Sequence, residues 1–314
     1  MVDGPAVPHD TPMLPLAALK GQRPPWPQWF NAAVTTPYET RFVDVEGTKV
    51  HYQIWGSPEK PGLLLVHGNG AHAHWYDFIA PSFSEDYCVV AMTFGGMGDS
   101  DPRPSYSVET FGREQLAVCE DAGLFRDGRK PFIAAHSFGG FVTLWTGAHF
   151  GDRFAGLVVI DTHIVTPGES HQRPPDRTRP NRIYPRFDMA LARFRLAPAQ
   201  PCENDFIVDY IGRHSLKEVD LEGQTGWTWK FDPFIWRRFD ADVDVETLLK
   251  KTSCRLSLMR GAESVLVTDR AWSYLATLRR DMEMHSIEGA QHHVMLDQPH
   301  RFIEQLRQQL QSWS

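Results

Sequence analysis

The sequence predicts an α/β protein with a mostly parallel, eight-stranded sheet that is flanked by helices and interrupted by one long insertion. Three observations lead to this prediction. Near residue 40 the chain shows the period-two pattern of a β-hairpin. Short apolar runs then alternate with segments of helix length. This alternation stops after Asp161 and resumes near residue 250, so one sheet is assembled from two separate parts of the chain.

The chain begins with a proline-rich segment, residues 1–38, that we expect to form an extended arm over the surface. The segment has neither a basic start nor an unbroken apolar stretch, so it does not resemble a secretory signal. No window of the chain approaches the roughly 20 apolar residues that a membrane span requires. We therefore expect a soluble protein with no membrane partner.

The predicted elements follow in order along the chain. RFVDVEG and KVHYQIW flank Glu46-Gly47-Thr48 and predict the hairpin. Residues 39–161 form the first part of the core, 162–250 the insertion and 251–314 the second part. Runs that are apolar on both faces are typical of strands buried in a parallel sheet. Four such runs are GLLLVH (62–67), YCVVAM (87–92), PFIAAH (131–136) and GLVVID (156–161). The alternation resumes after the insertion with CRLSLM (254–259) and MEMHSI (282–287).

Charge and cysteine usage restrict the partners and the compartment. The formal net charge of −7 provides no broad positive field, which argues against nucleic acid or an acidic membrane surface as the main partner. The four cysteines are widely scattered and show no C-x-x-C spacing, as expected for reduced thiols in a cytoplasmic protein. The oligomeric state cannot be inferred from these features.

AHSFGG, residues 135–140, lies where a buried strand gives way to a helix. A serine on such a sharp turn requires small neighbours two positions away, and Ala135 and Gly139 meet that requirement. Ser137 is therefore the candidate nucleophile. The competing interpretation is a serine that only caps the helix.

Two further segments supply the other parts of acyl-transfer chemistry. HGNG, residues 67–70, follows a buried strand, and we expect the backbone N–H groups of Asn69 and Phe138 to stabilise a developing oxyanion. EGAQHHVMLDQP, residues 288–299, follows the last predicted strand and contains a candidate general base. We choose His292 over His293 because it is the first residue after the tight GAQ turn.

In this order, LLLVHGNG, FGGMGDSD, AHSFGG, GLVVIDT, LMRGAES and GAQHHVMLDQP resemble the α/β-hydrolase superfamily, specifically its capped esterase and lactonase-like branch. The resemblance covers roughly residues 40–161 and 250–314 and implies the α/β-hydrolase fold with an inserted helical cap. It implies a serine hydrolase that cleaves a small apolar or aromatic ester or lactone without a cofactor. The alternatives are a C–C bond hydrolase of diketones with the same residues, and a receptor-like member with little turnover. Dehalogenases and epoxide hydrolases of this superfamily need an aspartate where this chain has Ser137.

The resemblance leaves two candidates for the acid that orients the histidine. Most relatives carry an aspartate three or four residues after a glycine like Gly261, where this chain has Ser264 and Val265. Asp161, at the end of a predicted strand, matches an alternative acid position that some members use. Glu263 is the second candidate because it lies on the usual loop and has a longer side chain.

The insertion offers candidate substrate-binding groups, each with a simpler structural explanation. Trp227, Trp229, Phe234 and Trp236 either line an apolar cavity or form the core of the cap itself. Seven arginines lie between His171 and Arg195. They either belong to a solvated loop or steer a carboxylated substrate toward the site. We predict no metal site, because the histidines near the start, His67, His72 and His74, lack a matching ligand set in the sequence.

Overall fold

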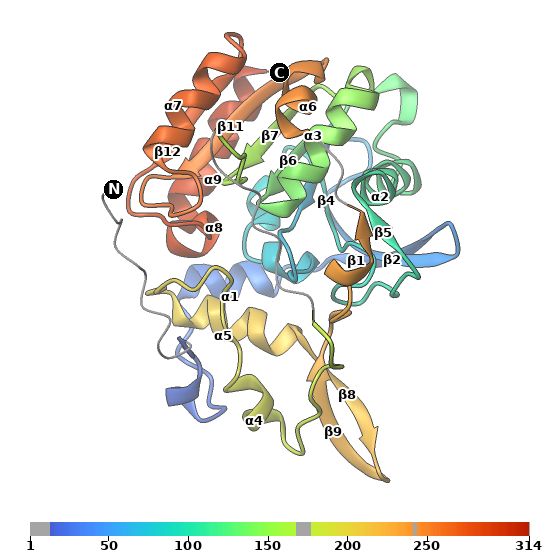
Figure 1. The fold of residues 1–314 in the computed structure, drawn as a ribbon, viewed down its shortest axis with the longest axis vertical. Coiled ribbons are helices and arrows are strands. Elements are labelled where there is room, and N and C mark those ends of the chain that lie inside the picture. Colours follow the sequence, from blue (N-terminus) through green and yellow to red (C-terminus); the bar gives the residue numbers. More distant parts are fainter. Residues whose placement is uncertain (1–12, 168–176, 241–243, 314) are drawn as a thin grey trace.

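One eight-stranded sheet runs through the molecule in the order β1-β2-β4-β3-β6-β7-β11-β12 (Figure 1). The computed structural model describes residues 13–167, 177–240 and 244–313. Within this sheet β4, β3, β6, β7, β11 and β12 pair in parallel, whereas β2 pairs antiparallel with β1 and β4. This confirms the predicted sheet. Its strands are β1 (Glu39–Val45), β2 (Thr48–Trp55), β3 (Gly62–Val66), β4 (Cys88–Met92), β6 (Phe132–His136), β7 (Gly156–Ile160), β11 (Arg255–Gly261) and β12 (Glu283–Ile287).

Both faces of the sheet are covered, so its central strands are apolar on both sides. In β3, Leu63 and Leu65 belong to one buried cluster, which includes residues of α9. Leu64 and Val66 belong to the other, which includes residues of α2, α3, α6 and α7. The helices of the core are α2 (Val108–Asp121), α3 (Phe138–Phe150), α6 (Val245–Lys251), α7 (Asp269–Leu278), α8 (Val294–Asp297) and α9 (Pro299–Ser312).

Local sequence explains where elements begin and turn. The β1–β2 hairpin closes through Glu46 and Gly47, which both have positive φ (53° and 79°), as a tight two-residue hairpin turn requires. Asp44 Oδ1 accepts a hydrogen bond from the Gly47 N–H at 3.0 Å. Helix α2 begins after Ser107, whose hydroxyl oxygen accepts a hydrogen bond from the Thr110 N–H at 3.0 Å.

The segment between β7 and α6 forms a cap at one end of the sheet (Figure 1). Its described residues include helices α4 (Phe187–Leu191) and α5 (Asp205–His214), and also a hairpin of β8 (Leu216–Leu221) and β9 (Gln224–Trp229). Short strand β10 (Phe239–Asp240) then pairs in parallel with β5 (Tyr106–Ser107) of the core. Parts of the predicted insertion, residues 168–176 and 241–243, lie outside the described residues.

The N-terminal segment differs from the predicted extended arm. Residues 1–12 lie outside the described residues, but the remainder contains a 3₁₀ turn (Ala17–Leu19) and helix α1 (Gln28–Val34). Phe30 is fully buried, with ring centroids 4.9 Å from Phe206 of α5 and 5.8 Å from Phe78 of the core. The segment therefore packs between cap and core, because its aromatic side chains gain more from burial than from lying on the surface.

Two simple properties follow from the described coordinates. Within residues 13–167, 177–240 and 244–313, no helix has the length and apolar character needed to cross a bilayer. All four cysteines of the chain are free thiols, and three of them, Cys88, Cys119 and Cys254, are buried.

Candidate active site

Ser137 occupies the turn between β6 and α3. Its backbone has φ 53° and ψ −121°, a conformation that a non-glycine residue adopts only when its surroundings impose it. Its side chain makes no capping hydrogen bond to α3, so helix capping does not account for the serine. The turn is also crowded, since a Cβ on Gly139 would lie 2.4 Å from the carbonyl oxygen of His67. These features match a strained turn that presents a nucleophile.

His292 and Asp161 are hydrogen-bonded to each other. His292 Nδ1 lies 2.8 Å from Asp161 Oδ1, and each residue is only 1% exposed. Asp161 directly follows β7 and His292 lies between β12 and α8, so the two residues are brought together at the carboxyl ends of the parallel strands. With Nδ1 donating to the carboxylate, His292 Nε2 remains as the nitrogen that can accept a proton.

The carboxylate of Asp161 is held by two further donors. Ser264 Oγ donates to Oδ1 at 2.7 Å, and the Gly261 N–H donates to Oδ2 at 2.8 Å. Both donors come from the end of β11 and the loop that follows it, where most relatives would carry the acid. Glu263 on the same loop is exposed, and within the described part of the chain no hydrogen bond joins it to His292. The geometry therefore favours Asp161 over Glu263.

Ser137 lies beside this pair through its neighbours in the chain. The Thr162 hydroxyl donates to the Ser137 carbonyl oxygen at 2.9 Å, and His136 Nε2 donates to the His292 carbonyl oxygen at 2.9 Å. Burial, and then the adjacent His292, hold the pKa of His136 well below its usual value. The His136 ring is therefore neutral, and its hydrogen bond holds the backbone of His292 in place. Among the described residues, Ser137 Oγ and His292 are not directly hydrogen-bonded. In free enzymes such contacts are often long and tighten when substrate binds.

The loop after β3 passes close to Ser137. A Cβ on Gly68 would lie 3.1 Å from the Ser137 Cβ, and the next residue, Asn69, is exposed. His67 fixes this loop, because Nδ1 donates to the Gly68 carbonyl oxygen at 2.6 Å while Nε2 accepts from the Phe94 N–H at 3.0 Å. Burial lowers the pKa of His67 to about 4, consistent with this neutral form.

Phe138, the second expected oxyanion donor, is the first residue of α3. The first N–H groups of a helix have no partner within the helix and are available to an anion. Asn69 and Phe138 thus lie on either side of Ser137 on two different elements, the loop after β3 and the start of α3.

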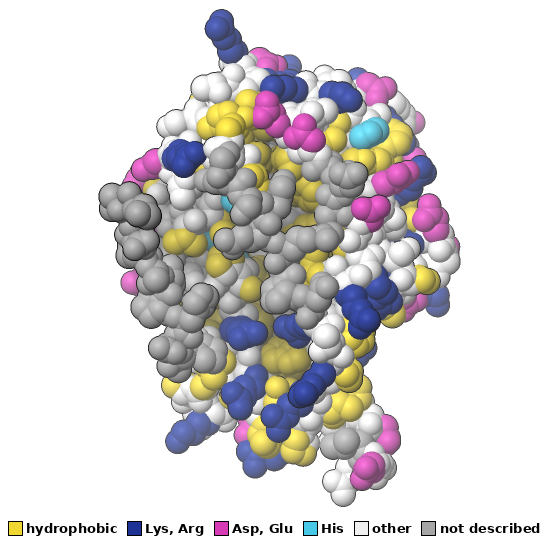
Figure 2. Space-filling view, viewed as in Figure 1, with side chains coloured by type: hydrophobic (Ala, Val, Ile, Leu, Met, Phe, Trp, Pro, Cys, Tyr) yellow, Lys and Arg dark blue, Asp and Glu magenta, His cyan; other side chains and the backbone are white. Residues whose placement is uncertain are grey.

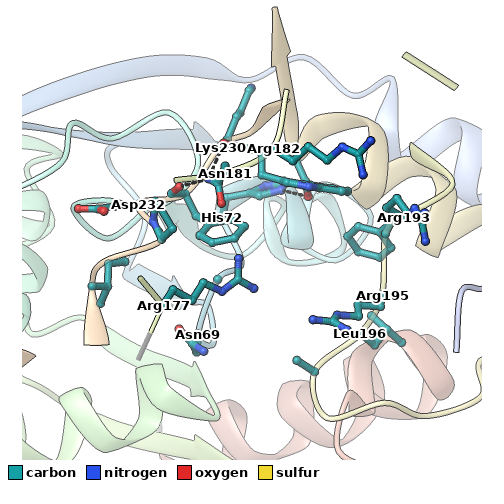
Figure 3. A pocket seen from close by; sticks show the side chains of 18 of the residues that line it. Asn69, His72, Arg177, Asn181, Arg182, Arg193, Arg195, Leu196, Lys230 and Asp232 are labelled. Atoms are coloured by element: carbon teal, nitrogen blue, oxygen red, sulfur yellow. Dashed lines mark hydrogen bonds between the residues drawn. The ribbon is translucent and has the colours of Figure 1, made fainter. Parts of the chain in front are cut away.

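A cavity of about 560 Å³ lies between the core and the cap, and Asn69 forms part of its wall (Figure 3). Of the four aromatic residues proposed from the sequence, Trp229 and Trp236 line it. Trp227 instead packs against Phe187, with ring centroids 4.7 Å apart, so it contributes to the core of the cap. Phe234 is likewise not among the lining residues, and its ring lies 5.9 Å from the guanidinium carbon of Arg238.

Two groups of residues near the site were not among the site residues predicted from the sequence. One consists of Ser264 and His136, which support the acid and the base and which have no distinguishing pattern in a single sequence. The other consists of arginines of the cap that line the cavity. Their signal in the sequence is the arginine-rich stretch, which predicted either a solvated loop or the steering of a carboxylated substrate. They are Arg177, Arg182, Arg193 and Arg195.

In the described part of the chain there are two clusters of potential metal ligands, and each brings three ligand atoms within 4.8 Å of one another. In His136, His292 and His293, nitrogen atoms are already engaged with Asp161 and a backbone carbonyl. The other cluster consists of His74, Asp77 and His214. The carboxylate of Asp77, which the sequence analysis passed over, lies 2.7 Å from His74 Nδ1.

The rings of His74 and His214 are stacked 4.1 Å apart at 26°. Their nitrogen lone pairs lie in nearly parallel ring planes and do not converge on one point. Tyr210 also donates to Asp77 Oδ2 at 2.6 Å, which leaves this oxygen engaged twice. The cluster therefore carries no metal assignment.

Comparison with known proteins gives a consistent family. A sequence profile described as "Alpha/beta hydrolase family" matches residues 63–305. Epoxide hydrolase 1 of Caenorhabditis elegans is 24% identical over 299 residues, which cover 88% of this chain and 71% of that protein. An esterase of Mycobacterium tuberculosis is 26% identical over 273 residues, covering 81% of this chain and 83% of the esterase.

Solved structures show the same fold. The crystal structure of the Mycobacterium tuberculosis esterase superposes with a TM-score of 0.66 at 23% identity, covering 94% of this chain and 96% of that chain. The thioesterase domain of the curacin biosynthetic pathway superposes with a TM-score of 0.69 at 17% identity, covering 87% and 100%. At these identities the superpositions establish the fold and not the reaction.

Proposed function

Because the chain belongs to the alpha/beta hydrolase family, we propose that it is a serine hydrolase that cleaves a carboxylic ester or a lactone. The observation that supports this most directly is the buried hydrogen bond between Asp161 and His292 at the turn that carries Ser137. A strained serine, an oriented imidazole and a buried carboxylate in this chain order are the groups that acyl transfer requires.

In the proposed mechanism, Ser137 Oγ attacks the scissile carbonyl carbon and His292 Nε2 takes its proton. Asp161 stabilises the imidazolium that forms, and the N–H groups of Asn69 and Phe138 hold the oxyanion. Collapse of the tetrahedral intermediate expels the alcohol, which receives the proton from His292. Water then attacks the acyl-enzyme by the same route and releases the acid.

The similarity to an epoxide hydrolase does not imply that this chain opens epoxides, because its nucleophile position holds a serine. Attack of a serine oxygen on an epoxide would produce an ether, which has no carbonyl group for water to attack. A carboxylate nucleophile produces an ester, which water can hydrolyse. With a serine at position 137, ester chemistry completes a catalytic cycle and epoxide opening does not.

The proposal is tested with 4-nitrophenyl butyrate and a fluorophosphonate probe. Wild-type protein should hydrolyse the ester and become labelled at Ser137, as located by peptide mass spectrometry. Ser137→Ala should lose both properties, whereas Ser105→Ala, at an exposed serine outside the site, should keep both. Full turnover by Ser137→Ala would refute the assignment. Labelling without turnover of any ester would favour a receptor-like protein, and turnover of a vinylogous diketone alone would favour a C–C hydrolase.

The four free cysteines support a reducing environment, so we also propose that the enzyme acts in the cytoplasm.

A further inference from the structure

The cap side of the cavity carries an excess of positive charge. Figure 2 shows Lys and Arg side chains gathered around an apolar hollow in the cap. Lys230 is neutralised by Asp99, with Nζ 2.7 Å from Oδ1. No described carboxylate, in contrast, lies within salt-bridge distance of the remaining basic residues of the lining, which are Arg177, Arg182, Arg193 and Arg195.

The acid that does line the cavity is already engaged. Asp232 Oδ2 accepts hydrogen bonds from Tyr106 and Arg238, and its Oδ1 accepts from the Phe234 N–H at 2.9 Å. Of the described cap arginines that do not line the cavity, three have carboxylate partners, as Arg213 has in Asp209 at 2.7 Å, whereas Arg179 and Arg237 have none among the described residues. Four of the six cap arginines that have no carboxylate partner among the described residues therefore line the cavity.

Arg177 and Arg195 extend toward each other across the cavity, with Asn69 nearby (Figure 3). Arg177 is exposed, and partial desolvation, followed by the positive charge of Arg195, lowers its pKa from the usual value. The guanidinium of Arg177 also lies 4.9 Å above the ring of Phe231, which orients it and leaves its in-plane N–H groups available. Two facing guanidinium groups repel each other when the cavity is empty, and an anion between them removes that repulsion.

We infer that the substrate carries an oxyanion, a carboxylate or a phosphate, which binds between Arg177 and Arg195 while its ester carbonyl faces Asn69 and Ser137. Guanidinium groups bind such anions through paired N–H···O contacts. Trp229 and Trp236 supply the apolar wall for the part of the molecule between the anion and the ester. This inference rests on the proposed function and specifies the substrate class of the same site.

The kinetic test compares two substrates of equal acyl length, 4-nitrophenyl hemiglutarate and 4-nitrophenyl valerate, of which only the first carries a carboxylate. Wild-type kcat/KM should favour the hemiglutarate by at least about 10-fold, mainly through KM. Arg177→Gln and Arg195→Gln should each reduce this preference by about 10-fold, because each removes a charged hydrogen-bond donor. Raising the salt concentration should weaken the preference as well.

Arg186→Gln is the matched control, because Arg186 belongs to the same arginine-rich stretch but does not line the cavity and is paired with Asp188. It should leave the preference unchanged. A wild-type preference below about 3-fold, or a preference that survives both Arg177→Gln and Arg195→Gln, would overturn the inference.

A binding measurement separates this inference from the hydrolase proposal. Glutarate and inorganic phosphate, titrated separately by calorimetry, contain no scissile ester and distinguish a carboxylate site from a phosphate site. At least one should bind to wild-type protein and lose about 10-fold in affinity in Arg177→Gln. If neither binds, the inference fails even when Ser137 is labelled. If one binds in this arginine-dependent way and Ser137→Ala retains turnover, the hydrolase mechanism fails and the anion site stands.

Discussion

Replacement of Asp161 by asparagine is the most informative single change in the active site. The carboxylate accepts three hydrogen bonds, from His292 Nδ1 at 2.8 Å, Ser264 Oγ at 2.7 Å and the Gly261 N–H at 2.8 Å. An amide of the same shape has one acceptor oxygen and one donor NH₂ group. It cannot accept all three bonds, so the outcome depends on which way the amide faces.

If the amide oxygen faces His292, the NH₂ group meets the Gly261 N–H, and two donors confront each other in a buried site. If the NH₂ group faces His292, the Ser264 hydroxyl can rotate to accept from it, and His292 can move its proton from Nδ1 to Nε2. The second orientation avoids the donor clash and is therefore preferred. It places a proton on the nitrogen that must accept one from Ser137.

The expected loss in kcat is about 10³-fold to 10⁴-fold, which corresponds to about 4 to 5.5 kcal/mol of transition-state stabilisation. Hydrolysis of 4-nitrophenyl butyrate measures it, with thermal melting as a check that the variant folds. Glu263→Gln is the matched control and should keep wild-type activity, because the Glu263 side chain is exposed. An active Asp161→Asn beside an inactive Glu263→Gln would refute the assignment of the acid.

The Asp161 hydrogen bonds, the packing of α3 and the burial of His67 can each be tested as well. The double variant Asp161→Asn/Ser264→Asp places a carboxylate on the neighbouring loop and should hydrolyse the ester about 10-fold faster than Asp161→Asn alone. If the double variant is no faster, the two side chains are not as close as the structure places them. Gly140→Ala should destabilise the fold by about 1 to 3 kcal/mol in urea unfolding, because its Cβ would lie 2.1 Å from Thr162 Oγ1, and unchanged stability would count against this packing. Burial lowers the pKa of His67 to about 4 in the folded protein, whereas the same side chain has a pKa of about 6.5 in the unfolded chain. His67 should therefore lower the free energy of unfolding by about 1.4 kcal/mol for each pH unit between pH 6.5 and pH 4. A melting temperature that stays constant from about pH 7 to 5 would contradict this.

The sheet could be predicted from the sequence because its central strands are buried on both faces. Such strands are continuous apolar runs, and the run GLVVID at 156–161 corresponds to β7 at Gly156–Ile160. The hairpin of the cap was not predicted, although its turn repeats an earlier signal. Glu222 and Gly223 have φ 52° and 81°, as Glu46 and Gly47 do at the first hairpin. The flanking strands of the cap are more polar, so the alternation was less evident.

The helix near the N-terminus was missed for a different reason. Prolines suggested an extended chain, but Pro27 directly precedes the first helical residue of α1, where a missing N–H costs nothing. The sequence left two candidates for the acid of the site, because a sequence does not show which side chains are buried. Asp161 is 1% exposed and Glu263 is exposed, and only the fold distinguishes them.

The contact of α1 with both halves of the molecule affects any attempt to change the cap. Phe30 touches Phe206 and Tyr210 of α5 as well as Phe78 of the core, so displacing the cap would bring this aromatic cluster into water. Exposure of one such side chain costs about 1.5 to 3 kcal/mol. Domain exchange with a related protein should therefore transfer residues 13–38 together with the insertion, because the aromatic side chains of α1 and α5, which are far apart in the sequence, are buried against each other.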